Sequence, residues 1–378
     1  MNFQHTEDRR MLADALNRYV TQEYSFEERR EIAASEQGYS KAKWRQLAEL
    51  GVIGALFTEK QGGYGGQGFD IATVFECLGR GLILEPVMES ALLAGTVLLD
   101  AESSVHQPLT EGVVSGNTIA VLGHFEPDSG YSHTYVGTSA SRAGDEWVLN
   151  GCKVNLFQGQ SAVTYVVSAR TSGAPGDVQG ISLFVVQAGT AGVSLRQHPS
   201  VDGGRVVDLV LDGVRVPAAA MLGDEGKAAA LIERALGKGV LALCAQAVGA
   251  MDVALANTVD YLKTRKQFGV PIGSFQALQH RMATMLIEVE QARSALINAS
   301  AAIDTEDRIA REKSLSAAKY LIGKVGTLVA EECVQMHGAV GMTAELPLSH
   351  YAKRLVMIDH ELGDAAFHLE RFILFGKE

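Results

Sequence analysis

The chain has 378 residues, 47% of them hydrophobic and 20% charged, which is ordinary for a globular protein with about two or three domains. Its formal net charge of −11 argues against nucleic acid or an anionic membrane surface as the main partner.

The cysteines indicate the redox state of the protein's compartment, and the hydropathy pattern indicates whether the chain spans a membrane. Four cysteines lie far apart, with no Cys-x-x-Cys pair and no Cys/His cluster: Cys77, Cys152, Cys244 and Cys333. This predicts free thiols in a reducing, cytoplasmic compartment, with no zinc or other metal site. No run of about 18 uncharged apolar residues is apparent, so no membrane span is expected.

Residues 1–115 are predicted to be mostly helical. Thr6 or Asp8 is a candidate N-cap for a first helix with Leu12, Leu16 and Tyr19 on one face. The glycine cluster between Gln61 and Gly68 is too dense for a helix and predicts a loop, and helix resumes from about 70 to 79. The cluster lacks the G-x-G-x-x-G order and does not predict a Rossmann site.

Residues 116–223 are predicted to form a β domain. Four runs rich in β-branched and aromatic residues are separated by Gly, Asp and Pro, and they begin near Trp147, Thr164, Ile181 and Val206. Residues 224–378 then return to helix, with long segments predicted at 226–264, 276–303 and 306–337. These lengths suit an antiparallel bundle.

The corner between the first two long helices carries a cluster of polar residues. Gly269, Pro271 and Gly273 stop one helix, and Ser274 is the expected N-cap of the next. Arg265, Gln267, Gln276 and His280 therefore gather at adjoining helix ends, where free backbone N–H groups and an arginine suit a phosphate. The alternative is a helical corner with solvated polar residues.

Five segments in this order resemble the acyl-CoA dehydrogenase family. They are Gln61–Gly66 with Glu76-x-x-Gly79-Arg80, Trp147–Lys153, Leu211–Pro217 with Leu222-Gly223, Arg265–His280, and Gln335–Thr343. The resemblance covers nearly the whole chain. It implies an α+β fold with an N-terminal helical domain, a middle β-barrel or sandwich domain and a C-terminal antiparallel four-helix bundle, and it implies FAD as cofactor.

The resemblance also implies the cofactor contacts. In the family the bundle corner reaches the FAD of a neighbouring subunit across a dimer interface. Arg265 would pair with the pyrophosphate, and the other contacts would be Gln267, Phe268, Gln276, Gln335, Gly338 and Ala339. The alternatives are core packing for Phe268 and a plain helix C-cap for Gly338.

The family oxidises the Cα–Cβ bond of an acyl-CoA thioester, with a carboxylate as base and electron-transfer flavoprotein as the usual acceptor. The base is usually the glutamate of a Glu-Gly-Thr segment, which here aligns with Leu362-Gly363-Asp364. Glu361 is the nearest carboxylate and the expected base, with Asp364 next; both are otherwise solvated charges at a helix end. The alternative base position of some relatives falls on Gly239, two turns from Glu233.

Two further departures concern the flavin-ring half of the site. The usual Thr/Ser-Glu-Pro-Gly segment reads Phe125-Glu126-Pro127-Asp128, and the usual Trp-Ile-Thr reads Asn155-Leu156-Phe157. This pattern resembles the smaller chain of two-gene dehydrogenases acting on pimeloyl-CoA or steroid side-chain CoA esters.

Three hypotheses follow. The chain is an acyl-CoA dehydrogenase, as a homo-oligomer or an α2β2 heterotetramer with a homologous subunit; or a non-catalytic structural subunit; or a relative with other flavin chemistry.

Overall fold

The computed structural model describes residues 6–377 and divides into two compact units. Unit 1 contains the residues up to Glu31, Gln67–Ile83 and the residues from Val240 onward; unit 2 contains Ile32–Gly66 and Leu84–Gly239. Of the predicted segments, 1–115 and 224–378 each contribute residues to both units, whereas 116–223 lies within unit 2. The two compact units are therefore not continuous stretches of the chain.

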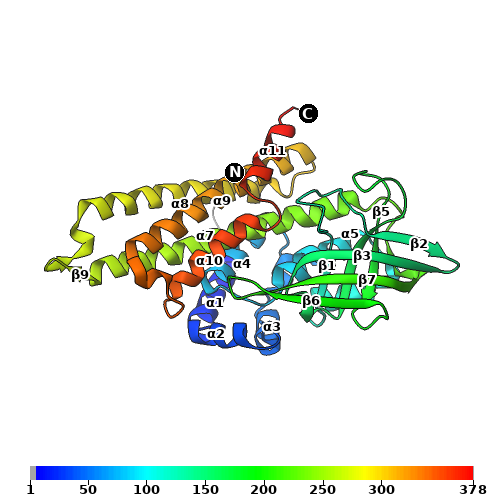
Figure 1. Cartoon of the computed structure of the whole chain (residues 1–378), viewed down its shortest axis with the longest axis horizontal. Coiled ribbons are helices and arrows are strands. Elements are labelled where there is room, and N and C mark those ends of the chain that lie inside the picture. The colour runs from blue at the N-terminus through cyan, green and yellow to red at the C-terminus, as the bar shows by residue number, and fades with distance from the viewer. Residues whose placement is uncertain (1–5, 378) are drawn as a thin grey trace. The chain divides into compact units, whose positions relative to one another are not determined.

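Unit 1 is helical. It contains α1 (Glu7–Glu23), α4 (Gly68–Gly81), α8 (Gln276–Ala302), α9 (Arg308–His337), η8 (Gly338–Met342), α10 (Pro347–His360) and α11 (Ala365–Leu374). Helix α7 (Ala229–Thr264) begins in unit 2 and continues through unit 1. The long helices α7, α8 and α9 run beside one another and confirm the three predicted helices (Figure 1).

Helix α9 is the centre of the bundle, because α8, α10 and α11 all pack against it. Helices α4, α7 and α8 are joined by a charge network in which Arg293 Nη2 lies 2.6 Å from Asp252 Oδ1 and Arg80 Nη2 lies 3.2 Å from Asp252 Oδ2. At the start of α1, Thr6 Oγ1 accepts a hydrogen bond from Arg9 N, which confirms the predicted N-cap.

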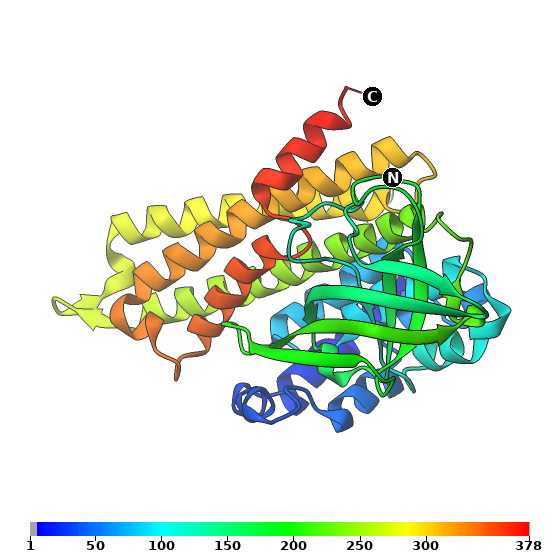
Figure 2. The same ribbon diagram turned by 45° about the vertical axis from the view of Figure 1, so that its right-hand side comes forward.

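Unit 2 is organised around one eight-stranded sheet (Figure 2). Its strands are β1 (Ala120–Gly123), β2 (Ser139–Ala143), β3 (Glu146–Phe157), β4 (Thr164–Arg170), β5 (Ile181–Gln187), β6 (Val193–Pro199), β7 (Arg205–Pro217) and β8 (Met221–Leu222). The order is β6-β7-β3-β2-β4-β5-β8, with β1 parallel to β4. The four predicted β runs are β3, β4, β5 and β7, so the middle β domain is confirmed.

Short helices complete unit 2: α3 (Lys41–Glu49), η1 (Gly54–Leu56), η2 (Glu59–Gln61), the π-helix η3 (Met88–Ala94), α5 (Gly95–Asp100), η4 (Ser104–His106), α6 (Gln107–Val114), η5 (Gly159–Ser161) and η6 (Ala218–Ala220). Helix α2 (Phe26–Ala34) spans the boundary between the units. The two tryptophans of the chain, Trp44 and Trp147, both lie in unit 2 and are buried.

Helix α7 is the most apolar long helix of the described residues. By length and composition it contains an 18-residue stretch apolar enough to cross a membrane. However, 72% of that stretch is buried inside the protein, as is usual for the core helix of a bundle. The four cysteines are free thiols.

Candidate functional site

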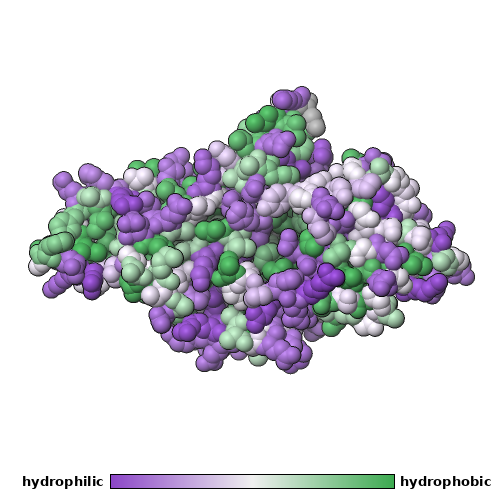
Figure 3. Space-filling view, in the orientation of Figure 1, coloured by the Kyte–Doolittle hydropathy of each residue, from purple (hydrophilic) through white to green (hydrophobic). Residues whose placement is uncertain are grey.

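The corner after α7 is a small hairpin that stands out from unit 1. Strands β9 (Lys266–Gln267) and β10 (Val270–Pro271) pair in antiparallel fashion, and Phe268 and Gly269 turn the chain at φ +55° and +82°. Phe268 is 91% exposed, so it does not pack in the core of this chain. Figure 3 shows hydrophobic surface at the same tip of the bundle, where Val270 and Phe275 are also exposed.

The start of α8 differs from the prediction. Its N-cap is Phe275, with no side-chain hydrogen bond, because the Ser274 hydroxyl donates instead to Pro271 O at 2.7 Å and closes η7 (Ile272–Ser274). The predicted Ser274 N-cap is therefore wrong. The start of α8 without a side-chain cap favours anion binding, since no capping side chain competes for the first N–H groups of the helix.

The second arm of the candidate cofactor site follows α9. The chain leaves α9 through Gly338 at φ +68° and forms η8, and Gln335, Gly338 and Ala339 are all exposed. A Cβ at Gly338 would enter open space, so a ligand can approach this backbone closely. The structure brings this arm to the same end of unit 1 as the hairpin, because Tyr261 of α7 stacks on His337 of α9 at 4.3 Å between ring centroids.

The donor set of the two arms fits a dinucleotide such as FAD. Arg265 offers a guanidinium that pairs well with phosphate, and Gln267, Gln276 and Gln335 offer amides for polar groups of the nucleotide. Every one of these side chains is exposed on unit 1, as is the Phe268 ring. The arrangement is therefore an open half-site, which a second surface must cover before the cofactor is enclosed.

The turn between α10 and α11 carries the candidate base residues. Lys319, fully buried on α9, donates hydrogen bonds to the carbonyls of Ile358 (2.8 Å), Asp359 (2.9 Å) and Gly363 (2.7 Å). Burial lowers the pKa of Lys319, but the three carbonyls and the C-terminal end of α10 favour its ammonium form.

Residues 362 and 363 both adopt left-handed backbone conformations in this turn. Leu362 has φ +54° and Gly363 has φ +112°, and a Cβ at Gly363 would lie 2.5 Å from Phe367 Cδ1 and 2.6 Å from His368 Nε2. A side chain at position 363 would clash with both residues, so glycine is the residue that fits this turn.

Both candidate carboxylates in the turn already have partners. Glu361 is 5% exposed and both of its carboxylate oxygens accept hydrogen bonds from Arg354, the second from Nη2 at 3.2 Å. Arg354 Nε also donates to Gln246 Oε1 of α7 at 3.0 Å. Asp364 Oδ1 accepts from Phe367 N at 2.8 Å and is the N-cap of α11.

Unit 2 carries the segment that departs most from the family pattern. Lys153, fully buried on β3, lies 2.6 Å from Glu126 Oε1 and also donates to Ser168 Oγ at 3.0 Å. The Glu126 carboxylate accepts two more hydrogen bonds, from Gly137 N (2.8 Å) and Thr138 N (2.9 Å). The surviving Glu-Pro thus has a structural function inside the β unit.

The pKa shifts in this cluster follow from burial and charge. Burial lowers the pKa of Lys153 to about 8, although Glu126 favours its charged form. Burial alone would raise the pKa of Glu126, but Lys153 and the hydrogen bonds from Thr138 hold it below its ordinary value. Burial, with the charge of Lys153, lowers the pKa of His124 to about 3, so this ring stays neutral.

The segment after Lys153 supplies no hydroxyl where the family has threonine. The register between β3 and β7 shifts between Lys153 and Leu156, and Asn155 sits at φ +59° with its side chain exposed. Leu156 is buried, and Phe157 is the last residue of β3. The alternative base position of the sequence analysis, Gly239, is buried in α7 and carries no carboxylate, and Glu233 lies on the same helix.

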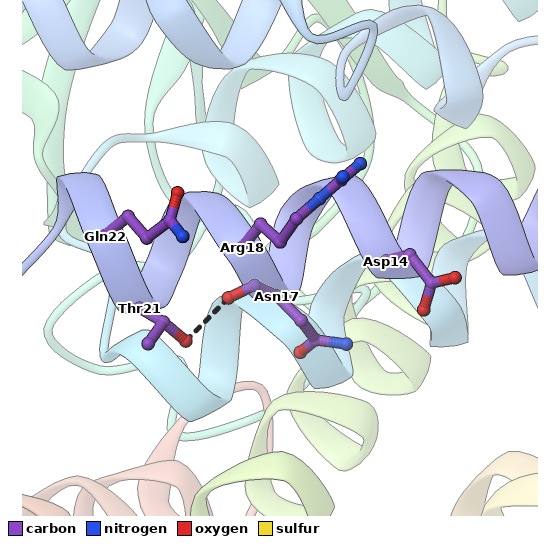
Figure 4. A pocket seen from close by; sticks show the side chains of 5 residues that line it. All are labelled: Asp14, Asn17, Arg18, Thr21 and Gln22. Atoms are coloured by element: carbon purple, nitrogen blue, oxygen red, sulfur yellow. Dashed lines mark hydrogen bonds between the residues drawn. The ribbon is translucent and has the colours of Figure 1, made fainter.

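One hollow on the surface of the described residues is not lined by any of the candidate site residues. A hollow of about 530 Å³ lies along α1 and is lined by Asp14, Asn17, Arg18, Thr21 and Gln22 (Figure 4). Within residues 6–377 no group of three or more His, Cys, Asp or Glu side chains is arranged to hold a metal ion.

Three family models match the chain: the acyl-CoA dehydrogenase N-terminal domain at residues 6–116, the middle domain at 122–214 and the C-terminal domain at 227–369. The short-chain specific acyl-CoA dehydrogenase of Megasphaera elsdenii is 30% identical over 325 residues, 83% of this chain and 84% of that protein.

Solved structures agree with this match. The ChsE4–ChsE5 complex from Mycobacterium tuberculosis gives a TM-score of 0.89 at 27% identity, over 100% of this chain and 99% of that chain. Butyryl-CoA dehydrogenase from Megasphaera elsdenii gives 0.90 at 25% identity, over 100% of both chains.

The fold and these matches together define an FAD-dependent oxidoreductase. The chain belongs to the acyl-CoA dehydrogenase family, whose members use FAD to dehydrogenate acyl-CoA thioesters, and its function is of that kind.

Sequence reasoning did not identify Arg354 and Lys319. Arg354 precedes Glu361 by seven residues, which is about two helical turns, so their spacing alone was a usable signal. Lys319 lies far from the turn in sequence, and its contact with three carbonyls depends on how α9 and α10 pack.

Proposed function

We propose that this chain is one of two homologous subunits of a hetero-oligomeric acyl-CoA dehydrogenase. It contributes the bundle half of an FAD site, and its partner contributes the carboxylate that accepts the α-proton. The observation that carries the proposal is the turn after α10. Arg354 donates to both carboxylate oxygens of Glu361 in this turn, and Asp364 caps α11. The resemblance implies that Leu362 occupies the position of the family's glutamate.

A base must reach the substrate with a free oxygen and change its protonation state during turnover. A buried carboxylate that accepts from a guanidinium through both oxygens is held ionised and fixed in place. Taking its proton-accepting oxygen away from Arg354 would break a largely buried charge-assisted hydrogen bond. Glu361 and Asp364 are therefore better suited to holding the turn than to accepting a proton.

In this proposal the chain's own residues bind and orient the cofactor. Arg265 pairs with the pyrophosphate, Gln267, Gln276 and Gln335 donate to polar groups of the nucleotide, and the backbone at Gly338 and Ala339 lies against it. The Phe268 ring covers the cofactor and excludes water. FAD, when bound, supplies the acceptor for the substrate hydride.

The β unit supports division of labour between two chains. Phe125 and Phe157 replace the hydroxyl residues that the family places near the flavin ring, whereas Glu126 and Lys153 keep the sheet intact. A homologous partner would then supply the flavin-ring half of the site. The ChsE4–ChsE5 structure is a complex of two proteins, and its similarity over the whole of this chain supports an α2β2 arrangement.

The first experiment counts flavin. The chain is purified alone and after co-expression with its candidate partner, and flavin absorbance and native mass are measured. The proposal expects little flavin on the chain alone and fewer flavins than chains in the mixed oligomer. One flavin on every chain of a homo-oligomer contradicts it and favours a self-sufficient enzyme.

The second experiment tests the cofactor residues in the mixed oligomer. Arg265→Met is expected to weaken FAD binding about 10-fold or more, because it removes a charge-assisted contact with phosphate. Lys263→Met is the matched control, since Lys263 is also an exposed cation in the last turn of α7. Equal effects of the two variants would contradict a specific role for Arg265 and would favour a structural subunit without a cofactor site.

A second candidate function is a self-sufficient homo-oligomer with Glu361 as the base. It is favoured by the position of Glu361, one residue from the family's glutamate and buried. Glu361→Gln separates the two candidates, with the exposed Glu370→Gln as control. Loss of turnover by 100-fold or more with FAD retained would establish Glu361 as the base; unchanged turnover supports the base of a partner.

The proposal also covers the substrate, the electron acceptor and the compartment of the enzyme. The substrate is an acyl-CoA, electrons pass to an electron-transfer flavoprotein, and the enzyme acts in the cytoplasm in fatty acid or steroid side-chain catabolism. These follow from the family and from the four free thiols. Reduction of the mixed oligomer by a panel of acyl-CoA esters, followed by reoxidation with an electron-transfer flavoprotein, tests the substrate and acceptor directly.

A further inference from the structure

The two arms of the proposed FAD half-site are far apart in sequence but must act together. One arm is the hairpin after α7, with Arg265 and Phe268, and the other is the turn after α9, with Gln335 and Gly338. Both arms are exposed, so neither is fixed by burial in the core. A contact that joins the end of α7 to the end of α9 is needed to keep their spacing constant.

Tyr261 makes such a contact from α7. It lies one turn before Arg265, whose backbone N–H donates to Tyr261 O at 2.8 Å. The Tyr261 ring stacks on the His337 ring with 4.3 Å between centroids and 22° between planes. The Tyr261 hydroxyl also donates to His337 O at 3.3 Å. That carbonyl belongs to the peptide that leads into Gly338.

His337 completes the contact from α9. It is the last residue of the helix and 6% exposed, and its Nδ1 donates to Cys333 O at 2.9 Å, which holds the ring against its own helix. Burial lowers the pKa of His337, so the ring that stacks on Tyr261 is neutral at pH 7. Stack and hydrogen bonds together fix the point at which the chain leaves α9.

A second contact near this end of α9 joins it to α8 and is weaker. Arg281 of α8 forms a bidentate pair with Glu332 of α9, at 2.5 and 2.9 Å. Arg281 is 42% exposed, and exposed pairs contribute little to stability because water and salt screen them. The partly buried stack between α7 and α9 is the contact that bears directly on both arms.

We propose that Tyr261 and His337 are positioning residues that hold the two arms of the FAD half-site in register. Neither side chain needs to touch the cofactor. Tyr261 sets the direction of Arg265 and the hairpin, and His337 sets the direction of Gly338 and Ala339. This proposal rests on the proposed function, which makes the two arms parts of one cofactor site.

The test compares FAD affinity with stability in the flavin-containing oligomer, with the partner chain co-expressed where flavin requires it. Tyr261→Leu removes the stack and the hydroxyl, Tyr261→Phe removes only the hydroxyl, and His337→Phe keeps a ring but removes Nδ1. Tyr320→Leu is the control, because Tyr320 is also a partly buried tyrosine, carried by α9. The FAD dissociation constant is measured by removing and restoring the cofactor, and Tm is measured on the cofactor-free protein.

Tyr261→Leu is expected to raise the FAD dissociation constant 10-fold or more, and Tyr261→Phe and His337→Phe about 3-fold each. Tyr320→Leu is expected to leave it unchanged at a similar Tm. A dissociation constant within 2-fold of wild type for Tyr261→Leu would overturn the proposal, as would an equal rise for Tyr320→Leu. If Tyr261→Leu does not fold, the two phenylalanine variants decide by the same criterion. If the wild-type oligomer is found to bind no FAD, the proposed function itself is refuted.

Discussion

The buried pair of Lys153 and Glu126 is expected to be strongly coupled. Lys153 is fully buried and Glu126 is 8% exposed, so each charge depends on the other for compensation. Lys153→Met leaves a buried carboxylate that retains only the N–H groups of Gly137 and Thr138. Removing one partner of a buried pair costs about 3–5 kcal/mol of unfolding free energy.

The double variant separates coupling from simple loss of contacts. Glu126→Gln leaves the Lys153 ammonium with only neutral partners, and is expected to cost about 3 kcal/mol. Lys153→Met with Glu126→Gln leaves no buried charge, so it is expected to be no less stable than either single variant. The coupling free energy is therefore expected to be at least about 3 kcal/mol, at the top of the range for residues in direct contact.

Tryptophan fluorescence during urea unfolding measures these values, because Trp44 and Trp147 both report on unit 2. The control cycle uses Arg215→Met and Glu146→Gln, a pair of similar distance (2.7 Å) that is 60% and 48% exposed. Its coupling is expected to be below about 1 kcal/mol. Single-variant effects of Lys153 and Glu126 that add within about 0.5 kcal/mol would refute the reasoning.

Three further outcomes are expected in unit 1. Lys319→Met removes a buried donor from three carbonyls, of which Ile358 O keeps the N–H of Glu361, and is expected to lower stability by about 3–5 kcal/mol, whereas exposed Lys324→Met costs below about 0.5 kcal/mol, as measured by urea unfolding followed by circular dichroism. Gly363→Ala forces a Cβ against Phe367 and His368 and is expected to lower Tm by several degrees; an unchanged Tm would show that the turn can relax. Burial lowers the pKa of His368 to about 3, so below about pH 6.5 the unfolded chain binds a proton that the folded chain does not. As the pH is lowered below about 6.5, the unfolding free energy therefore decreases by up to about 1.4 kcal/mol per pH unit, and His368→Asn is expected to flatten that slope.

The long helices and the main strands were predictable from local sequence. Helices α7, α8 and α9 are bounded by Gly and Pro or by polar turns, and their apolar residues recur at helical spacing, so the ends were predicted within a few residues. The Ser274 N-cap was wrong because a nearer carbonyl, Pro271 O, accepted its hydroxyl. Local capping patterns do not register such competition.

The environment of the candidate acids was not predictable in the same way. The sequence identified Glu361 by its position, but Gln246, which shares Arg354 with it, lies 108 residues before that arginine. The sequence likewise singled out Glu126-Pro127 as a remnant without indicating that Lys153 would be its partner across the sheet. Such pairings depend on strand register and helix packing, which no local pattern encodes.

The division into two units has a consequence for synthesis on the ribosome. Unit 2 is complete once residue 239 has emerged, whereas unit 1 needs α1 and α4 from the start of the chain and α8 to α11 from its end. At about 5–20 residues per second, α1 and α4 therefore wait on the order of ten seconds or more for their packing partners. During that interval the face of α4 that packs against α8 in the folded protein remains uncovered.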